Sequence, residues 1–214
     1  MKTKDKKICF IGDSITEGVG ASSKEKCYVS VFEKISGADV TNLGISGTRI
    51  ARQQKNMINE IWDSNEFLTR VDKIPKDTQI IAIFGGTNDY GHGDAPFGNM
   101  NDRTADTFFG ALHMLSAAVI ERFPAATVFF MTPLKRYDEY QNNASNSLTL
   151  ESYADAVKSV AKYYSIPVLD LYAEAGMQPC IEAQNKYYFA DGVHPNDNGH
   201  ERVARKVMEF IKNL

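Results

Sequence analysis

The chain has 214 residues and a formal net charge of −3, and 43% of its residues are hydrophobic and 24% charged. This length suits one domain, which we expect to span residues 1–214 and to bury about 70% of the surface that the unfolded chain exposes. The composition is that of an ordinary globular protein, and the small negative charge provides no basic field for nucleic acid. Three cysteines far apart in the sequence argue for a reducing compartment.

The first apolar segment is too short for a signal peptide. It covers Ile8–Ile11 after a basic start and stops at Gly12. No other apolar stretch approaches the ~20 residues that span a bilayer. We therefore expect a cytoplasmic protein with no membrane partner, and the sequence leaves its oligomeric state open.

Short apolar runs rich in β-forming residues alternate with longer segments of helical periodicity. The runs predicted to be strands buried on both faces are residues 7–11, 40–43, 79–84, 127–132 and 167–171. The clearest helices are predicted at about residues 103–123, 150–164 and 197–213. This alternation predicts a three-layer α/β/α fold with a flavodoxin-like, doubly wound, five-stranded parallel sheet. The last helix should pack on the sheet through a stripe at helical spacing, made of Val203, Val207, Phe210, Ile211 and Leu214.

A serine follows the first predicted strand, in Gly12–Thr16. Ligands of open parallel sheets bind beyond the carboxyl ends of the strands, where Ser14 would expose its hydroxyl. Ser14 and Glu17 also fit the S-x-x-E capping box, so this segment alone favours a helix N-cap.

Glycines follow the second and third strands. In Asn42–Gly47 they can turn backbone N–H groups into a cavity that holds an anionic oxygen, or form merely a turn. In Gly85–Asp89 the side-chain amide of Asn88 stands beside a tight turn, where it can donate a hydrogen bond or form only an Asx-turn. The polar segment 135–147, after the fourth strand, is predicted to be a flexible rim loop over the site.

A carboxylate and an imidazole lie three residues apart before the last helix, in Asp191–Asn196. A glycine-containing turn can fold the carboxylate onto the Nδ1–H of the ring. A turn and an N-cap account for Asp191 and Asn196, but they leave His194 without a role.

The four segments, in this order, resemble the sequence blocks of the SGNH hydrolases, also called GDSL lipases or esterases. Gly12–Ile15 looks like the nucleophile block, Gly44 the second block, Gly86–Asp89 the G-x-N-D block and Asp191–Pro195 the D-x-x-H block. The one departure is Ile15 where leucine is usual, a change that conserves volume.

The resemblance implies a serine ester hydrolase with a Ser14, His194 and Asp191 triad and no cofactor or metal. Ser14 would attack the acyl carbonyl, His194 would move the proton, and Asp191 would hold the imidazole tautomer. The oxyanion would be bound by the backbone N–H groups of Ser14 and Gly44 and by the amide of Asn88.

The other histidines have structural interpretations. His113 is expected at the surface or the edge of the core, and His200 in the first turns of the last helix, without a catalytic role. His92 is expected on a loop near the oxyanion donors, where it is either solvated or in contact with substrate. A metal site would need ligands from His92, Asp94, His194 and His200, among which no pair has zinc-motif spacing.

The acyl group and the alcohol depend on loops around the site. Residues expected to contact substrate are Asp13, Tyr90, Tyr137 and Tyr188, the aromatic ones as a wall that stacks a sugar or an acyl chain, or else as core. We expect a soluble short-chain ester of a small molecule or carbohydrate, such as an O-acetyl group. Lysophospholipid or acyl-thioester hydrolysis is the alternative.

Two non-enzymatic interpretations also fit the alternating pattern. One is a flavodoxin-like module with a flavin phosphate at the first strand-to-helix turn, although the carboxylate of Asp13 would repel a phosphate there. The other is a catalytically inactive relative that only binds a ligand. All four functional positions carry the expected residue types, which argues against this interpretation.

Overall fold

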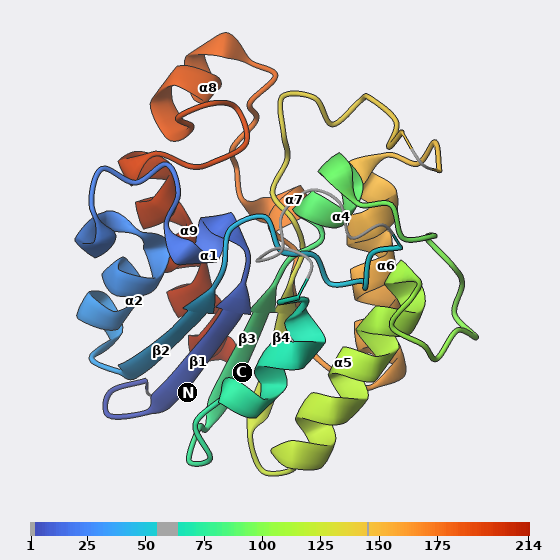
Figure 1. The fold of residues 1–214 in the computed structure, drawn as a ribbon. Coiled ribbons are helices and arrows are strands. Elements are labelled where there is room, and N and C mark those ends of the chain that lie inside the picture. The colour runs from blue at the N-terminus through green and yellow to red at the C-terminus, as the bar shows by residue number, and fades with distance from the viewer. Residues whose placement is uncertain (1–2, 55–63, 145) are drawn as a thin grey trace.

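The computed structural model describes residues 3–54, 64–144 and 146–214. Parallel strands form one five-stranded sheet in the order β2-β1-β3-β4-β5 (Figure 1). The strands are β1 (Lys7–Gly12), β2 (Asp39–Gly44), β3 (Ile80–Phe84), β4 (Thr127–Met131) and β5 (Val168–Leu169). All five predicted strands are confirmed, and Gly12 pairs with both Gly44 and Phe84, which brings the carboxyl ends of three strands level.

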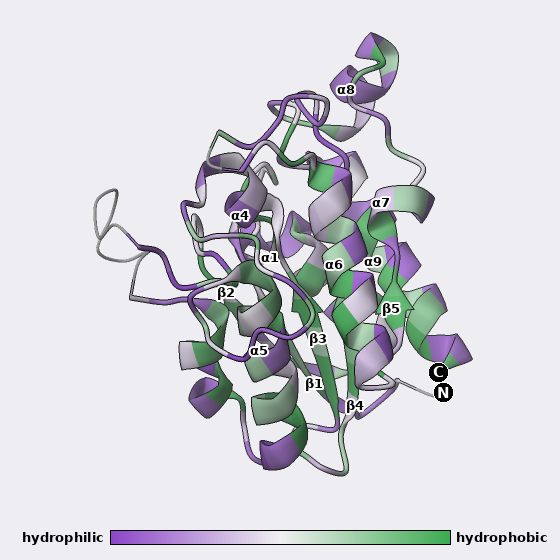
Figure 2. Ribbon diagram, turned by 90° about the vertical axis from the view of Figure 1, so that its right-hand side faces the viewer, coloured by the Kyte–Doolittle hydropathy of each residue, from purple (hydrophilic) through white to green (hydrophobic). Residues whose placement is uncertain are grey.

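Helices cover both faces of this sheet, so the predicted three-layer α/β/α fold is confirmed (Figure 1). On one face lie α2 (Tyr28–Ser36) and α9 (Asp197–Asn213), and on the other lie α5 (Phe108–Arg122), α6 (Leu150–Tyr163) and the 3₁₀ helix η2 (Phe67–Lys73). Figure 2 shows the hydrophobic strands enclosed between helices whose outer faces are hydrophilic. In the described part of the chain, no helix is long and apolar enough to cross a membrane.

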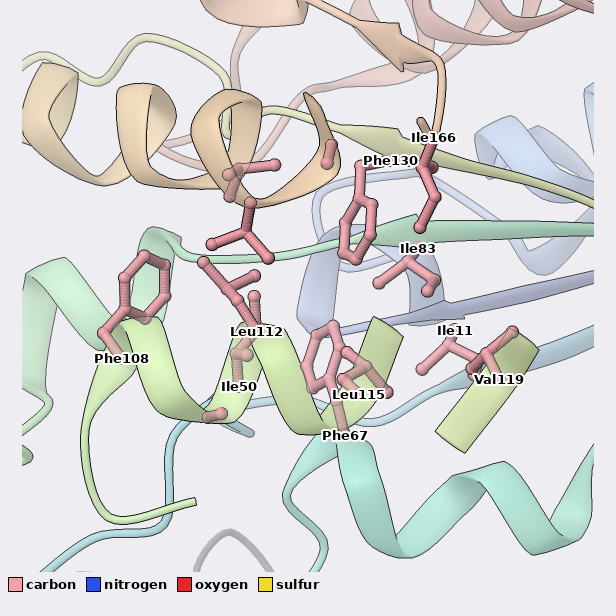
Figure 3. Packing of buried hydrophobic residues seen from close by; sticks show 14 of the residues in the cluster. Ile11, Ile50, Phe67, Ile83, Phe108, Leu112, Leu115, Val119, Phe130 and Ile166 are labelled. Carbon is pink, nitrogen blue, oxygen red and sulfur yellow. The ribbon is translucent and has the colours of Figure 1, made fainter. Parts of the chain in front are cut away.

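The strands are apolar throughout because both faces are buried. Successive side chains of a strand point to opposite faces. Phe10 therefore packs edge-on against Phe32 of α2, with ring centroids 5.4 Å apart, whereas Ile11 joins the cluster that includes Leu115 and Val119 of α5 (Figure 3).

The predicted apolar stripe of α9 is confirmed for Val203, Val207 and Ile211, which are fully buried. Burying each such side chain contributes about 1.5–3 kcal/mol. Phe210 is partly buried against the same cluster, but Leu214 is 40% exposed because the helix has already ended at Asn213.

Two long helices begin and end within a residue of their predicted limits, whereas α5 begins five residues later than expected. Its N-cap is Thr107, whose side chain accepts the N–H of Gly110, and the chain before it forms turns. The short helices near the carboxyl edge of the sheet and its flanks are α1 (Ser14–Glu17), η1 (Lys24–Lys26), α4 (Thr87–His92), α7 (Leu171–Glu174) and α8 (Glu182–Tyr188).

Candidate active site

The structure brings the predicted nucleophile, base and carboxylate together at the carboxyl edge of the sheet. Ser14 Oγ, in the first turn of α1, lies 2.9 Å from His194 Nε2. On the other side of the ring, His194 Nδ1 lies 2.7 Å from Asp191 Oδ2. Ser14 and His194 are 180 positions apart in the chain, so only the fold makes this contact.

The Asp191 carboxylate is held as an anion by its surroundings. Partial burial by itself raises the pKa of Asp191, but hydrogen bonds from His194 and from the Val193 N–H outweigh burial and hold that pKa below its ordinary value. Its Oδ1 accepts the N–H groups of Val193 and His194 at 2.9 and 2.7 Å. The anion therefore keeps the proton on Nδ1, which leaves Nε2 to accept the hydroxyl proton of Ser14.

Asp13, not Ser14, is the N-cap of α1. Its buried carboxylate accepts the Ile15 N–H at 3.0 Å, and Ser14 is the first helical residue. The capping-box interpretation is therefore wrong, and Glu17 instead accepts the N–H of Ser46 at 2.6 Å. Because Asp13 is 2% exposed and does not line the pocket, the expectation that it contacts substrate is corrected.

Gly44, the second predicted oxyanion donor, lies outside the pocket, whereas Gly47, three residues later, lines it. The Gly44 N–H donates to Asn42 Oδ1 at 2.8 Å, and its Cα packs so closely on α1 that a Cβ would lie 2.2 Å from the Glu17 nitrogen. Gly44 does not line the pocket, so its assignment is wrong. Gly47 does line it, with φ +74°, and the described residues offer its N–H no hydrogen-bond acceptor. Both glycines belong to the segment that the sequence singled out.

Asn88 lies in the first turn of α4, directly after β3 and the left-handed Gly86. Its Nδ2 donates to the carbonyl of Thr48 at 3.0 Å, and its Oδ1 lies 3.2 Å from His92 Nε2. An amide nitrogen carries two hydrogens, so one remains for a ligand oxygen. Asn88 and Ser14 line the same pocket, as predicted for two oxyanion donors.

This pocket has a volume of about 480 Å³. It lies beyond the carboxyl ends of β1 and β3, the neighbouring strands at which the sheet order reverses, where open α/β sheets bind ligands. Its lining consists of Ser14, Val19, Ser46, Gly47, Asn88, His92, Arg136, Tyr137, Asp191, Val193 and His194.

Only one of the three tyrosines expected to contact substrate lines the pocket. The Tyr137 side chain is 54% exposed, and its ring lies against Gly192, where a Cβ would come within 2.8 Å of ring carbon Cδ1. Tyr188 is corrected, because it packs on the core beside α9 with the Arg202 guanidinium 5.5 Å from its ring centroid.

Tyr90 is also corrected, because it anchors the rim loop and does not line the pocket. Its buried hydroxyl lies 2.7 Å from the carbonyl oxygens of both Asp138 and Gln141. The segment 135–147 follows β4 at the edge of the site, as predicted, with Ser145 lying outside the described residues.

The remaining histidines occupy three different environments. His200 is buried in the first turn of α9, where its Nδ1 accepts the Tyr28 N–H at 3.1 Å, consistent with a structural role. His113 is fully buried beside the Tyr164 hydroxyl, not at the surface, and His92 lines the pocket from α4, not from a solvated loop. Among residues 3–54, 64–144 and 146–214, no three His, Cys, Asp or Glu side chains gather to hold a metal ion.

A parallel α/β sheet with a Ser-His-Asp arrangement at its carboxyl edge is typical of serine hydrolases. Residues 10–202 match the GDSL-like lipase/acylhydrolase family, and the chain belongs to this family. Members of this family act on ester bonds through a serine.

Known proteins with related sequences and folds agree with this assignment. The chain is 25% identical over 232 aligned residues to a multidomain esterase from Ruminococcus flavefaciens; the match covers 96% of this chain but 28% of that protein, so the chain spans about a quarter of this relative. A solved structure from Lactobacillus plantarum is 30% identical, with a TM-score of 0.83 over 98% of both chains. An acetyl xylan esterase, AlAXEase, shares the fold at 20% identity, with a TM-score of 0.63 over 96% of this chain and 99% of the other.

Proposed function

We propose that this chain is a serine esterase that hydrolyses a short-chain acyl ester, with Ser14, His194 and Asp191 as its catalytic triad. The observation that carries the proposal is the continuous contact from Ser14 Oγ to His194 Nε2, at 2.9 Å, and from His194 Nδ1 to Asp191, at 2.7 Å. Both distances are within hydrogen-bond reach, which a nucleophile, its base and the group that orients the base require.

In the first half of the reaction, Ser14 Oγ attacks the acyl carbonyl carbon while His194 Nε2 takes the hydroxyl proton. The resulting imidazolium is stabilised by the Asp191 carboxylate and gives its proton to the departing alcohol. A water molecule then attacks the acyl-serine in the same way, with His194 as base, and releases the acid and the free serine.

The charge that develops on the carbonyl oxygen would be stabilised by three N–H donors. The first is the backbone N–H of Ser14, which has no intrahelical acceptor because it lies in the first turn of α1. The others are the backbone N–H of Gly47, in place of Gly44, and the remaining Nδ2 hydrogen of Asn88. Donors fixed in place before the reaction stabilise the transition state without reorganisation.

A carbohydrate O-acetyl group is the substrate that we propose. The exposed ring of Tyr137 lines the pocket beside the turn that carries Asp191 and His194. It offers a flat apolar face of the kind that stacks on a sugar. The likeness to a multidomain esterase supports ester hydrolysis, and the likeness in fold to an acetyl xylan esterase is consistent with an acetylated carbohydrate. Long-chain lysophospholipids and acyl thioesters are the competing substrates for the test.

Hydrolysis of p-nitrophenyl acetate, butyrate and octanoate by wild type and Ser14→Ala tests this function. We expect turnover that falls with chain length and that drops to background in Ser14→Ala, with unchanged circular dichroism. A folded Ser14→Ala variant as active as wild type would refute the triad. A preference for octanoate would refute the short-chain substrate while leaving the triad in place, and lipid esters would then be the substrates to test.

A further inference from the structure

We propose that His92 is a positioning residue for the oxyanion hole, held by Arg49 as a neutral ring protonated on Nε2, through which it fixes and polarises the amide of Asn88. The proposal rests on the esterase function proposed above and assigns a task to a histidine that the triad does not use. His92 lines the same pocket as Ser14 and comes from α4, whereas the histidine of the triad comes from the turn before α9.

The contacts form a chain that runs from a buried cation to the oxyanion donor. Arg49, 2% exposed, places its Nη1 at 3.1 Å from His92 Nδ1. His92 Nε2 lies 3.2 Å from Asn88 Oδ1, and Asn88 Nδ2 lies 3.0 Å from the Thr48 carbonyl oxygen. Asn88 and His92 are four residues apart in α4, so they share one face of the helix.

The chemistry of the two end groups determines the direction of every hydrogen bond in this chain. A guanidinium only donates, so His92 Nδ1 must be the acceptor and the ring is neutral with its proton on Nε2. That N–H donates to Asn88 Oδ1. The Thr48 carbonyl only accepts, so it independently requires Nδ2 on the opposite side of the Asn88 amide. Both ends therefore agree on one amide orientation, which leaves the second Nδ2 hydrogen, and not the carbonyl oxygen, for a ligand in the pocket.

This direction of the hydrogen bonds also makes the side-chain N–H of Asn88 a stronger donor to the oxyanion. A hydrogen bond received by an amide oxygen draws electron density from its nitrogen and makes the N–H a better donor, and such cooperativity grows in a low-dielectric interior. The buried Arg49 cation at the far end acts in the same sense. The benefit increases as negative charge develops on the substrate oxygen, so it should appear in kcat more than in KM.

Neighbouring contacts hold the two ends of the chain in place. The buried Asp89 carboxylate, next to Asn88 on α4, accepts the N–H groups of Ile50 and Ala51 at 3.0 and 2.9 Å. The segment that carries Arg49 and Thr48 is thereby tied to the helix that carries Asn88 and His92. The amide of Asn88 is therefore oriented by a preformed framework before substrate arrives.

The test compares His92→Phe with His92→Gln on p-nitrophenyl acetate, each alone and in an Asn88→Ala background. We expect His92→Phe, which removes the hydrogen bonds to Arg49 and Asn88 at similar size, to lower kcat about tenfold with KM nearly unchanged, the effect of about one hydrogen bond. His92→Gln keeps one donor and one acceptor and should recover most of the loss. In the Asn88→Ala background, His92→Phe should cost nothing more, because His92 acts through Asn88.

His113→Phe serves as the matched control, since His113 is buried in α5 outside the pocket lining. It should lower the melting temperature but leave kcat unchanged. The nitrogen chemical shifts of His92 should also report the Nε2-protonated tautomer. An unchanged kcat in His92→Phe, a change in KM alone, a loss that multiplies with that of Asn88→Ala, or the opposite tautomer would each overturn the proposal. A wild type that does not hydrolyse the ester would refute the esterase function, and a folded Ser14→Ala variant with full activity would refute the triad. Both results differ from those that overturn the role of His92.

Discussion

Asn88 is the residue at which orientation matters most, because its side chain has one acceptor and one donor group of nearly the same shape. The Thr48 carbonyl and the His92 ring place the donor group toward the pocket. Backbone donors such as the N–H of Ser14 are fixed by the chain itself, whereas a side-chain donor depends on its neighbours.

Asn88→Ala should reduce kcat by about 10²–10³-fold, because one of the three proposed oxyanion donors is lost while the proposed triad is intact. The residual rate should exceed that of Ser14→Ala, which removes the nucleophile. Initial rates with p-nitrophenyl acetate measure both. An Asn88→Ala variant with the wild-type rate would remove this residue from the oxyanion hole and leave the triad assignment untouched.

At the scale of elements, the six-residue helix α4 organises the site more than its length suggests. Successive residues face different parts of the fold: Asn88 faces the pocket, Asp89 binds the N–H groups of Ile50 and Ala51, and Tyr90 holds the rim loop. The glycine before the helix allows the sharp turn from β3 that this arrangement needs, with φ +106° at Gly86.

Tyr90→Phe should loosen the rim loop by leaving the carbonyls of Asp138 and Gln141 without their shared hydroxyl partner. The expected loss of unfolding free energy is about 1 kcal/mol. Since Tyr137 lies on this loop and lines the pocket, KM for an acetylated sugar should rise while kcat changes little. Tyr163→Phe, at an exposed position of α6, is the matched control and should change neither the unfolding free energy nor KM. An unchanged KM in a destabilised Tyr90→Phe would separate loop anchoring from substrate binding.

At the scale of the whole molecule, the parallel topology assembles the site from distant segments. Ser14 follows β1, Gly47 follows β2 and Asn88 follows β3, and these strands are neighbours whose carboxyl ends lie level. The turn before α9 then brings His194 across to Ser14. The same assembly buries the carboxylates of Asp13 and Asp89 beneath the site.

These buried carboxylates make the stability of the fold depend on pH. Burial raises the pKa of Asp13 to about 6 from 3.8, and it does the same for Asp89. The folded protein therefore holds protons that the unfolded chain has released, and the stabilisation, on the order of 3 kcal/mol for Asp13, is present below about pH 4 and is lost as the pH rises through about 6.

Asp13→Asn should flatten this dependence, because asparagine keeps an acceptor for the Ile15 N–H without a titrating charge. The difference in unfolding free energy between wild type and variant, from urea denaturation at pH 4 to 7.5, should shift in favour of the variant as pH rises. Asp39→Asn, at an exposed position of β2, should show no such shift. A parallel course of the wild-type and Asp13→Asn curves would show that this carboxyl does not titrate in the window.

Much of the fold and the pairing of Asp191 with His194 could be predicted because these features depend on residues close together in the chain. Apolar runs buried on both faces mark the strands, and Asp191 and His194 are close enough in the chain for one turn to join them. The predictions that were wrong also have physical reasons. The start of α5 depends on the Thr107 cap, and the interior location of His113 depends on helices packed around it, neither of which a periodicity reveals.

By itself the sequence determined the order of strands and helices and the carboxyl edge as the place of the site, since both follow from spacing along the chain. The resemblance of its four segments to the SGNH blocks supplied the residues that we propose for the chemistry. Only the tertiary structure decided that Gly47 and not Gly44 faces the pocket. The Gly44 N–H donates to Asn42, and the Cα of Gly44 packs closely against α1. The tertiary structure also decided that Tyr90 anchors a loop while His92 lines the pocket, because those roles depend on which groups from distant segments meet each side chain.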